Sequence, residues 1–476
     1  MSGINFKMEF MKNILSKENK LNIILIFFVA ILGSLILIIP IQYLLAIFLL
    51  LCIFLYFIFK PQHCYYLLIF TIPFRDRIRE LPFISFSVNE IFILTCTVSV
   101  ILNIFFRNEK VNLRTKIDVW LVALLILYFE AGFYSLNPRA LLSSFKFLEA
   151  VLAFYLTVYF IRTKKVKITY IVKAFLFTGL FQALLGILQS STGQFGAGQL
   201  VDRGILGYLG VGPTVVRRAV GTFGGTGGLA EILATLTFFI WPFCRFLNKK
   251  KKIFILFIFI TAIYMGYGKL PFMELRVCWL FYLIYTSKNT KAILSKLSKF
   301  LTITLGVILL SFCTPFAATI YDSIQTRFLL WKYPIYMLSN DIHLLLFGSG
   351  LNSYYDLLIP ILPQNQIGVY TGSGTEYSNW LLVHNYYLLV IQEMGLVGFF
   401  ILFSFFFYLI KIFNTNYFQT KSSNRKIFLS GFLVILPVFI SSLFGQLFME
   451  PAVKIMFFIF WGVALSKINI KDKKFV

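Results

Sequence analysis

Long apolar runs separated by short polar and basic stretches make up most of the chain. A helix that crosses a membrane needs roughly 20 mostly apolar residues. About fourteen runs approach this length, and the one at 63–74 is the shortest of them. The pattern predicts an all-α polytopic membrane protein with about 12–14 transmembrane helices. The predicted spans are 21–39, 41–59, 63–74, 85–106, 118–135, 144–161, 168–189, 229–247, 253–268, 270–286, 300–318, 384–410, 427–446 and 451–466.

The composition excludes a soluble chain. Hydrophobic residues make up 59% and charged residues 13%, whereas soluble globular proteins carry about 25% charged residues. The six cysteines lie in or beside apolar runs and form no CxxC pair. This arrangement argues against disulfides and against structural zinc.

The net charge of +25 is mostly a signal of membrane orientation. With the N-terminus in the cytoplasm, most of the 44 Lys and Arg residues fall in cytoplasmic loops, as the positive-inside rule requires. Nucleic acid is therefore not expected as a partner. The cations left outside or within the membrane are nine arginines and five lysines. Because the planar guanidinium suits phosphate better than an ammonium does, this bias predicts an outward-facing anion site.

Two segments expected on the outer side are long enough to be functional. Residues 190–228 are rich in glycine, and residues 319–383 form the longest polar stretch, within which 327–347 has the apolar spacing of a helix lying along the membrane surface. Four motifs stand in or beside them. They are RAVGTFGGTGGLA from Arg218, RFLLW from Arg327, GSGLNSY from Gly348, and HNYYLLVIQEMGLVG from His384.

These motifs, in this order, resemble the O-antigen ligase and polymerase superfamily, bacterial membrane glycosyltransferases that use polyprenyl-diphosphate-linked glycans. The resemblance covers roughly residues 168–410, which implies a core flanked by N-terminal helices (1–167) and by C-terminal helices with a basic tail (411–476). By this resemblance, the catalytic residues are His384, Arg327 and Arg218. The substrate-binding residues are Arg217, Asn385, Trp331, Arg276 and Tyr354.

The chemistry of the reaction asks for the same residue types. Transfer from a lipid diphosphate needs a group that accepts the proton of the acceptor hydroxyl, and cations for the charge growing on the diphosphate. His384 is suited to the first task, and Arg218 and Arg327 to the second. The outer segments contain no DxD pair, so we expect the arginines to replace a metal, with no cofactor. Glu393 is expected to fix helix packing or bind a buried cation, and Gly395 to permit close helix approach.

The sequence thus predicts an inverting, metal-independent glycosyltransferase of the bacterial inner membrane, with its active site on the periplasmic side. It would move a glycan from undecaprenyl diphosphate to an acceptor in surface polysaccharide or lipopolysaccharide biosynthesis. The acceptor is lipid A–core for a ligase, slightly favoured by the intact His384 motif, or another lipid-linked glycan for a polymerase. A carrier or flippase for lipid-linked glycans is the alternative. The intramembrane acids would suit a carrier, but the chain has no two-fold repeat; these acids are Glu90, Glu130, Glu149, Glu231 and Glu393.

Overall fold

The computed structural model describes residues 52–74, 77–80, 85–109, 111–194, 200–202, 215–217, 219–222, 228–266, 269–287, 289–312, 316–358, 360, 385–420, 424–445 and 447–468. The chain divides into two compact units, Met1–Pro61 and Gln62–Val476. The described residues of the first unit include one short helix, Cys52–Phe59.

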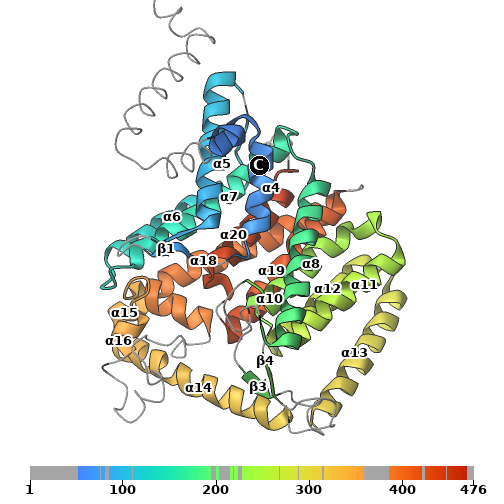
Figure 1. Ribbon diagram of the computed structural model, residues 1–476. Helices are drawn as coiled ribbons and strands as arrows, with labels where there is room; N and C mark the ends of the chain where they lie inside the picture. Colours follow the sequence, from blue (N-terminus) through green and yellow to red (C-terminus); the bar gives the residue numbers. More distant parts are fainter. Residues whose placement is uncertain are drawn as a thin grey trace, which may run out of the picture. The chain divides into compact units, whose positions relative to one another are not determined.

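Helices dominate the second unit (Figure 1). The α-helices are α4 (Pro61–Thr71), α5 (Val88–Arg107), α6 (Asp118–Phe133), α7 (Ala140–Arg162), α8 (Ile168–Thr192), α10 (Gly228–Ile240), α11 (Lys249–Met265), α12 (Lys269–Thr286), α13 (Thr290–Phe312), α14 (Phe316–Asn340), α15 (Ile342–Phe347), α16 (Tyr354–Leu358), α18 (Tyr386–Gln419), α19 (Arg425–Phe444) and α20 (Pro451–Leu465). Two 3-10 helices, η1 (Trp241–Phe246) and η4 (Leu447–Met449), follow α10 and α19. The strands form two small antiparallel pairs, β1 (Arg77–Glu80) with β2 (Ser85–Ser87) and β3 (Leu200–Asp202) with β4 (Val215–Arg217).

The predicted class, an all-α polytopic membrane protein, is confirmed. Among the described residues, five helices are long and apolar enough to cross a membrane, or six if Cys52–Phe59 and α4 together form one broken span. The five are α5, α7, α8, α18 and α19, and α10 and α20 are apolar but shorter. Each predicted span from residue 85 to residue 466 overlaps a helix. The predicted span 21–39 and most of 41–59 lie outside the described residues.

Two predicted elements differ from the structure. Helix α4 has 11 residues, about 17 Å at 1.5 Å per residue, and therefore cannot cross a hydrocarbon core of roughly 30 Å by itself. The segment predicted as an outer loop from residue 319 is helical as far as Asn340, because α14 begins at Phe316 and continues through Pro334. The apolar spacing recognised from residue 327 belongs to the second half of this longer helix.

Helix α20 forms the centre of the bundle and is buried along nearly its whole length. It packs closely on α7, where Gly462 leaves room for the side chain of Thr157. On another side, the ring of Phe460 stacks on Phe239 of α10 at 3.8 Å between centroids. These contacts give α7, α10 and α20 fixed relative positions, from which α18 and α19 extend the bundle.

Candidate functional site

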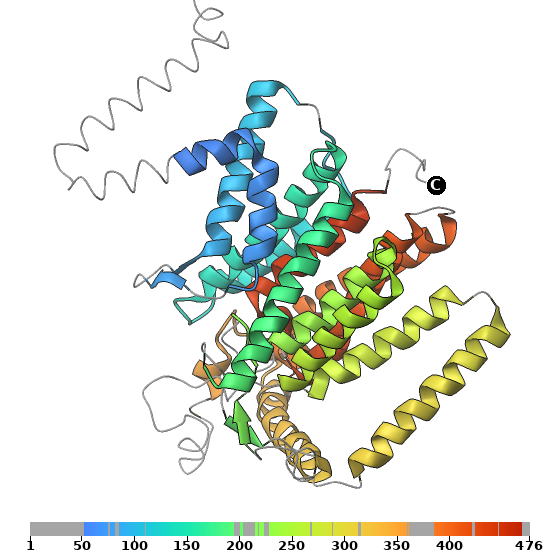
Figure 2. The ribbon, with the colours of Figure 1, turned by 45° about the vertical axis from the view of Figure 1, so that its right-hand side comes forward.

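Segments predicted on opposite sides of the membrane lie at opposite ends of the second unit. At one end, the guanidinium of Arg162, the last residue of α7, donates to the carbonyl of Ile468, and Lys165 pairs with Glu109 at 2.8 Å. At the other end, the α6–α7 turn meets residues 348–354, with Asn137 Nδ2 donating to the carbonyl of Asn352 at 3.1 Å. Figure 1 shows α14, α15, α16 and the β3–β4 pair at this second end. Figures 1 and 2 both show α14 lying crosswise to α8.

Arg327 lies on this crosswise helix and is half-buried. Its guanidinium carbon is 5.9 Å from the centre of the Phe444 ring, within the range of a cation–π contact. The carboxylate of Glu231, on α10, is its electrostatic partner. Burial lowers the pKa of the Arg327 guanidinium, and the nearby Glu231 carboxylate offsets only part of that decrease. An arginine side chain nevertheless remains a cation at neutral pH.

Trp331 joins three of the sequence motifs in one apolar cluster. It stands one helical turn after Arg327 and packs against a core that contains Tyr354 of α16 and Leu389 of α18. Its ring centroid lies 6.3 Å from that of Phe444, the residue that also faces Arg327. The motifs that begin at Arg327, Gly348 and His384 are thereby brought together, although almost 60 residues separate the first from the last.

The glycine-rich motif is linked to the same place through α10. The Gln189 side chain of α8 accepts from the N–H groups of Val220 and Gly221 at 3.1 and 2.7 Å. Thr222, the next residue, accepts from the side chain of Gln182 at 2.9 Å. Helix α10 starts six residues later and carries Glu231, the electrostatic partner of Arg327.

The remaining predicted site residues fall into three groups. Asn385 is the N-cap of α18, and its side chain accepts from the Leu388 N–H at 3.0 Å. Arg276 is half-buried on α12. His384, Arg218 and the side chain of Arg217 lie outside the described part of the chain.

Two carboxylates near Glu231 were not expected from the sequence. Glu450 and Glu274 both interact with it electrostatically. Glu274 has no exposed surface, and neither of its carboxylate oxygens has a hydrogen-bond partner among the described residues. The sequence does contain one sign of Glu274, because it is an isolated acidic residue within a mostly apolar helix. Among the described residues, no three His, Cys, Asp or Glu side chains are close enough together to hold a metal ion.

A second set of charged side chains lies in the interior of the helical bundle. Lys454 on α20 is buried, interacts electrostatically with Glu450, Glu393 and Glu149, and lies 5.6 Å above the Tyr128 ring. Beyond it, on α7, Lys146 pairs with Glu149 at 3.6 Å and also with Glu90 of α5. Buried charges of this kind are expensive in a membrane and usually serve a purpose.

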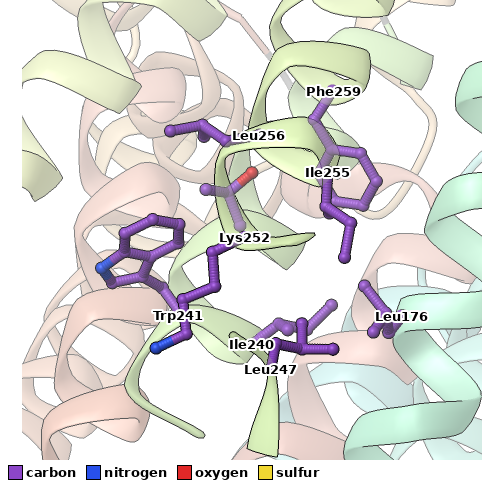
Figure 3. A pocket seen from close by; sticks show the side chains of 9 residues that line it. Leu176, Ile240, Trp241, Leu247, Lys252, Ile255, Leu256 and Phe259 are labelled. Carbon is purple, nitrogen blue, oxygen red and sulfur yellow. The ribbon is translucent and has the colours of Figure 1, made fainter. Parts of the chain in front are cut away.

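The cavity in Figure 3 lies away from these residues, between α8, α10, η1 and α11. Its walls are apolar except for Thr237 and Lys252. At about 20 Å³ it has room for roughly one water molecule. It is therefore not a glycan site.

Comparison of the chain with protein-family models gave no match, and comparison with curated protein sequences gave none either.

Proposed function

We propose that this membrane protein is an inverting, metal-independent glycosyltransferase of the O-antigen ligase type, with a polymerase almost as well supported. The observation that carries the proposal is the convergence of the motifs. Trp331, Tyr354 and Leu388 come from three motifs of the resemblance and belong to one apolar cluster. Arg327 stands one turn from this cluster on a helix that lies across the end of the bundle.

In the proposed reaction, the hydroxyl oxygen of the acceptor attacks the anomeric carbon of a glycan linked to undecaprenyl diphosphate. The bond from that carbon to the diphosphate oxygen breaks, and the electron pair leaves with undecaprenyl diphosphate. His384 accepts the hydroxyl proton, while Arg327 and Arg218 stabilise the leaving diphosphate. Glu231 supports the role of Arg327, because its carboxylate interacts electrostatically with the guanidinium and favours the charged form that a diphosphate requires. We place this chemistry on the periplasmic face of the inner membrane.

The test compares Arg327→Lys with Arg139→Lys. Both changes keep the positive charge, and Arg139 is an exposed residue at the same end of the molecule. A lysine at position 327 keeps its attraction to Glu231 but loses the fork that holds two diphosphate oxygens at once. Arg327→Lys should therefore slow transfer on the order of 10-fold to 1000-fold, while Arg139→Lys stays close to the unsubstituted protein. Equal rates for the two variants at matched expression would refute the proposed diphosphate site.

A carrier for lipid-linked glycans is the second candidate, and the interior charges favour it. Lys454, Lys146 and their carboxylate partners lie within the helical bundle, where transporters commonly place ionisable groups. Reconstituted vesicles discriminate between the two functions. Movement of a labelled lipid-diphosphate glycan across the bilayer without an acceptor would indicate the carrier. Consumption of the donor that depends on the acceptor would indicate the transferase.

A further inference from the structure

Helix α18 is broken at Gly395, and the break is closed by another part of the chain. Gly395 has φ 68° and ψ −178°, a conformation that is essentially confined to glycine. The carbonyls of Gln392 and Glu393, just before the break, accept the N–H groups of Ser349 and Gly350, both at 2.9 Å. Residues 348–354, here named the clasp, thus supply donors at the point where the helix is interrupted.

The clasp is also tied to the α6–α7 region. The Leu351 N–H donates to the carbonyl of Ala131 at 3.0 Å, and the Ser135 hydroxyl donates to the carbonyl of Leu351 at 2.6 Å. On its other side, Asn352 Nδ2 donates to the Ser143 hydroxyl at 2.8 Å. The clasp therefore connects the first part of α18 to α6, to the turn that follows α6 and to α7.

Glu393 makes the one side-chain bond from α18 to the clasp backbone that the described residues show. Its Oε1 accepts the Asn352 N–H at 2.9 Å, and the residue is 5% exposed. Asn352 itself has a left-handed backbone with φ 57°, so the direction of its N–H is set by an uncommon conformation. If the acceptor is lost, a partly buried N–H is left without a partner, which is more costly than the loss of an average hydrogen bond.

The first part of α18 needs such a support. Hydrogen bonds of the helix fix residues 386–394 relative to one another, but the break at Gly395 interrupts the continuous ladder that would fix them relative to the rest of α18. Asn385 is the N-cap of this first part, and His384 directly precedes it in sequence. Anything that sets the direction of residues 386–394 also sets where Asn385 stands.

We propose that Glu393 is a positioning residue, which holds the clasp against the broken α18 and so sets the place of Asn385 and of His384 before it. This inference rests on the proposed transferase function, because only there does the place of His384 matter for a rate. It also has a consequence that is independent of that function: the amide protons of the clasp should exchange slowly, and their protection should depend on an acceptor at position 393.

The experiment compares Glu393→Gln with Glu393→Met. Glutamine keeps an oxygen that can accept the Asn352 N–H, whereas methionine keeps the length of the side chain without an acceptor. Gln392→Met is the matched control, because Gln392 is also buried but reaches the clasp through its backbone carbonyl alone. Hydrogen–deuterium exchange of peptides covering the clasp is measured for the full-length protein in lipid nanodiscs, together with kcat and KM for transfer.

Glu393→Met should speed exchange in the clasp by roughly 10-fold or more and lower kcat by a similar factor, with KM for the donor nearly unchanged. Glu393→Gln and Gln392→Met should resemble the unsubstituted protein in both measurements. If Glu393→Met does not fold, Ser143→Ala removes the acceptor of the Asn352 side chain and should change exchange and kcat in the same direction, by a smaller factor.

Three results would overturn the inference: unchanged exchange in Glu393→Met, equal damage from glutamine and methionine, or faster exchange with unchanged kcat. Equal damage would show that the charge of Glu393 beside Lys454 matters, and not its bond to the clasp. Absence of transfer by the unsubstituted protein refutes the proposed function and with it the role in positioning His384. The exchange measurement then still decides whether Glu393 holds the clasp.

Discussion

Gly395→Ala should be among the most destabilising single changes in this protein. A Cβ atom at Gly395 would fall on the carbonyl group of Leu346 and lie 2.5 Å from the nitrogen of Phe347. The contact between Gly348 and α18 is similarly close, since a Cβ at Gly348 would lie 2.5 Å from the backbone of Glu393. Both obstacles are backbone atoms, which cannot move aside as a side chain can. The two segments of the backbone approach so closely only because both positions are glycine.

The cost follows from two contributions. Alanine in this backbone conformation costs of order 1–3 kcal/mol. Displacing Leu346 and Phe347 also pulls the clasp from α18 and breaks its two bonds to Gln392 and Glu393, at about 1 kcal/mol each. The sum of about 3–5 kcal/mol is a large part of a typical native stability of about 5–15 kcal/mol.

The assay is the temperature at which half of the purified protein leaves the monodisperse peak in size-exclusion chromatography. Gly431→Ala is the control, because Gly431 is a buried residue within α19 whose added Cβ would meet side chains of Ala464 and Phe413 at 3.0 to 3.2 Å. Gly395→Ala should lower this temperature by about 6–10 °C, at roughly 2 °C per kcal/mol. A decrease no larger than that of Gly431→Ala would show that the break and its clasp do not contribute to stability as argued.

Three further predictions concern the proposed site. An impermeant maleimide added from the periplasmic side should label Leu136→Cys, which is 76% exposed in the α6–α7 turn, and not Lys250→Cys, on a background without the six native cysteines; labelling in the opposite sense would reverse the orientation. Transfer should continue in excess EDTA, since arginines are proposed to stabilise the diphosphate, and a strict requirement for added magnesium or manganese would contradict this. Glu231→Gln should slow transfer several-fold, because it removes the electrostatic partner of Arg327. Glu130→Gln, at an exposed position of α6, should not change the rate, and similar rates for both would remove Glu231 from the site.

The sequence by itself determined the class of the protein and the course of most of its helices. Whether a segment enters a membrane depends on how apolar and how long that segment is, and not on a specific partner. Runs such as 144–161 and 168–189 could therefore be recognised as helices before any contact was known. The position of Asn385 at the start of a helix was also readable, because a capping side chain bonds to a backbone N–H only three residues away. Apolar runs and helix caps depend only on residues close together in the chain, so both can be read from the sequence.

Only the tertiary structure decided what lies next to what. The sequence predicted that Glu393 would fix helix packing or bind a buried cation, but its hydrogen-bond partner, Asn352, stands 41 residues earlier, in a segment with no helical period. No pattern along α18 indicated the break at Gly395, because a glycine in a mostly apolar run is also compatible with a continuous helix that packs closely on a neighbour. Glu231 was expected as an intramembrane acid and Arg327 as a diphosphate ligand, without any sign that the two interact electrostatically. Such pairings depend on how α10 and α14 meet, which is set by the packing of many side chains at once and leaves no mark at fixed spacing in the chain.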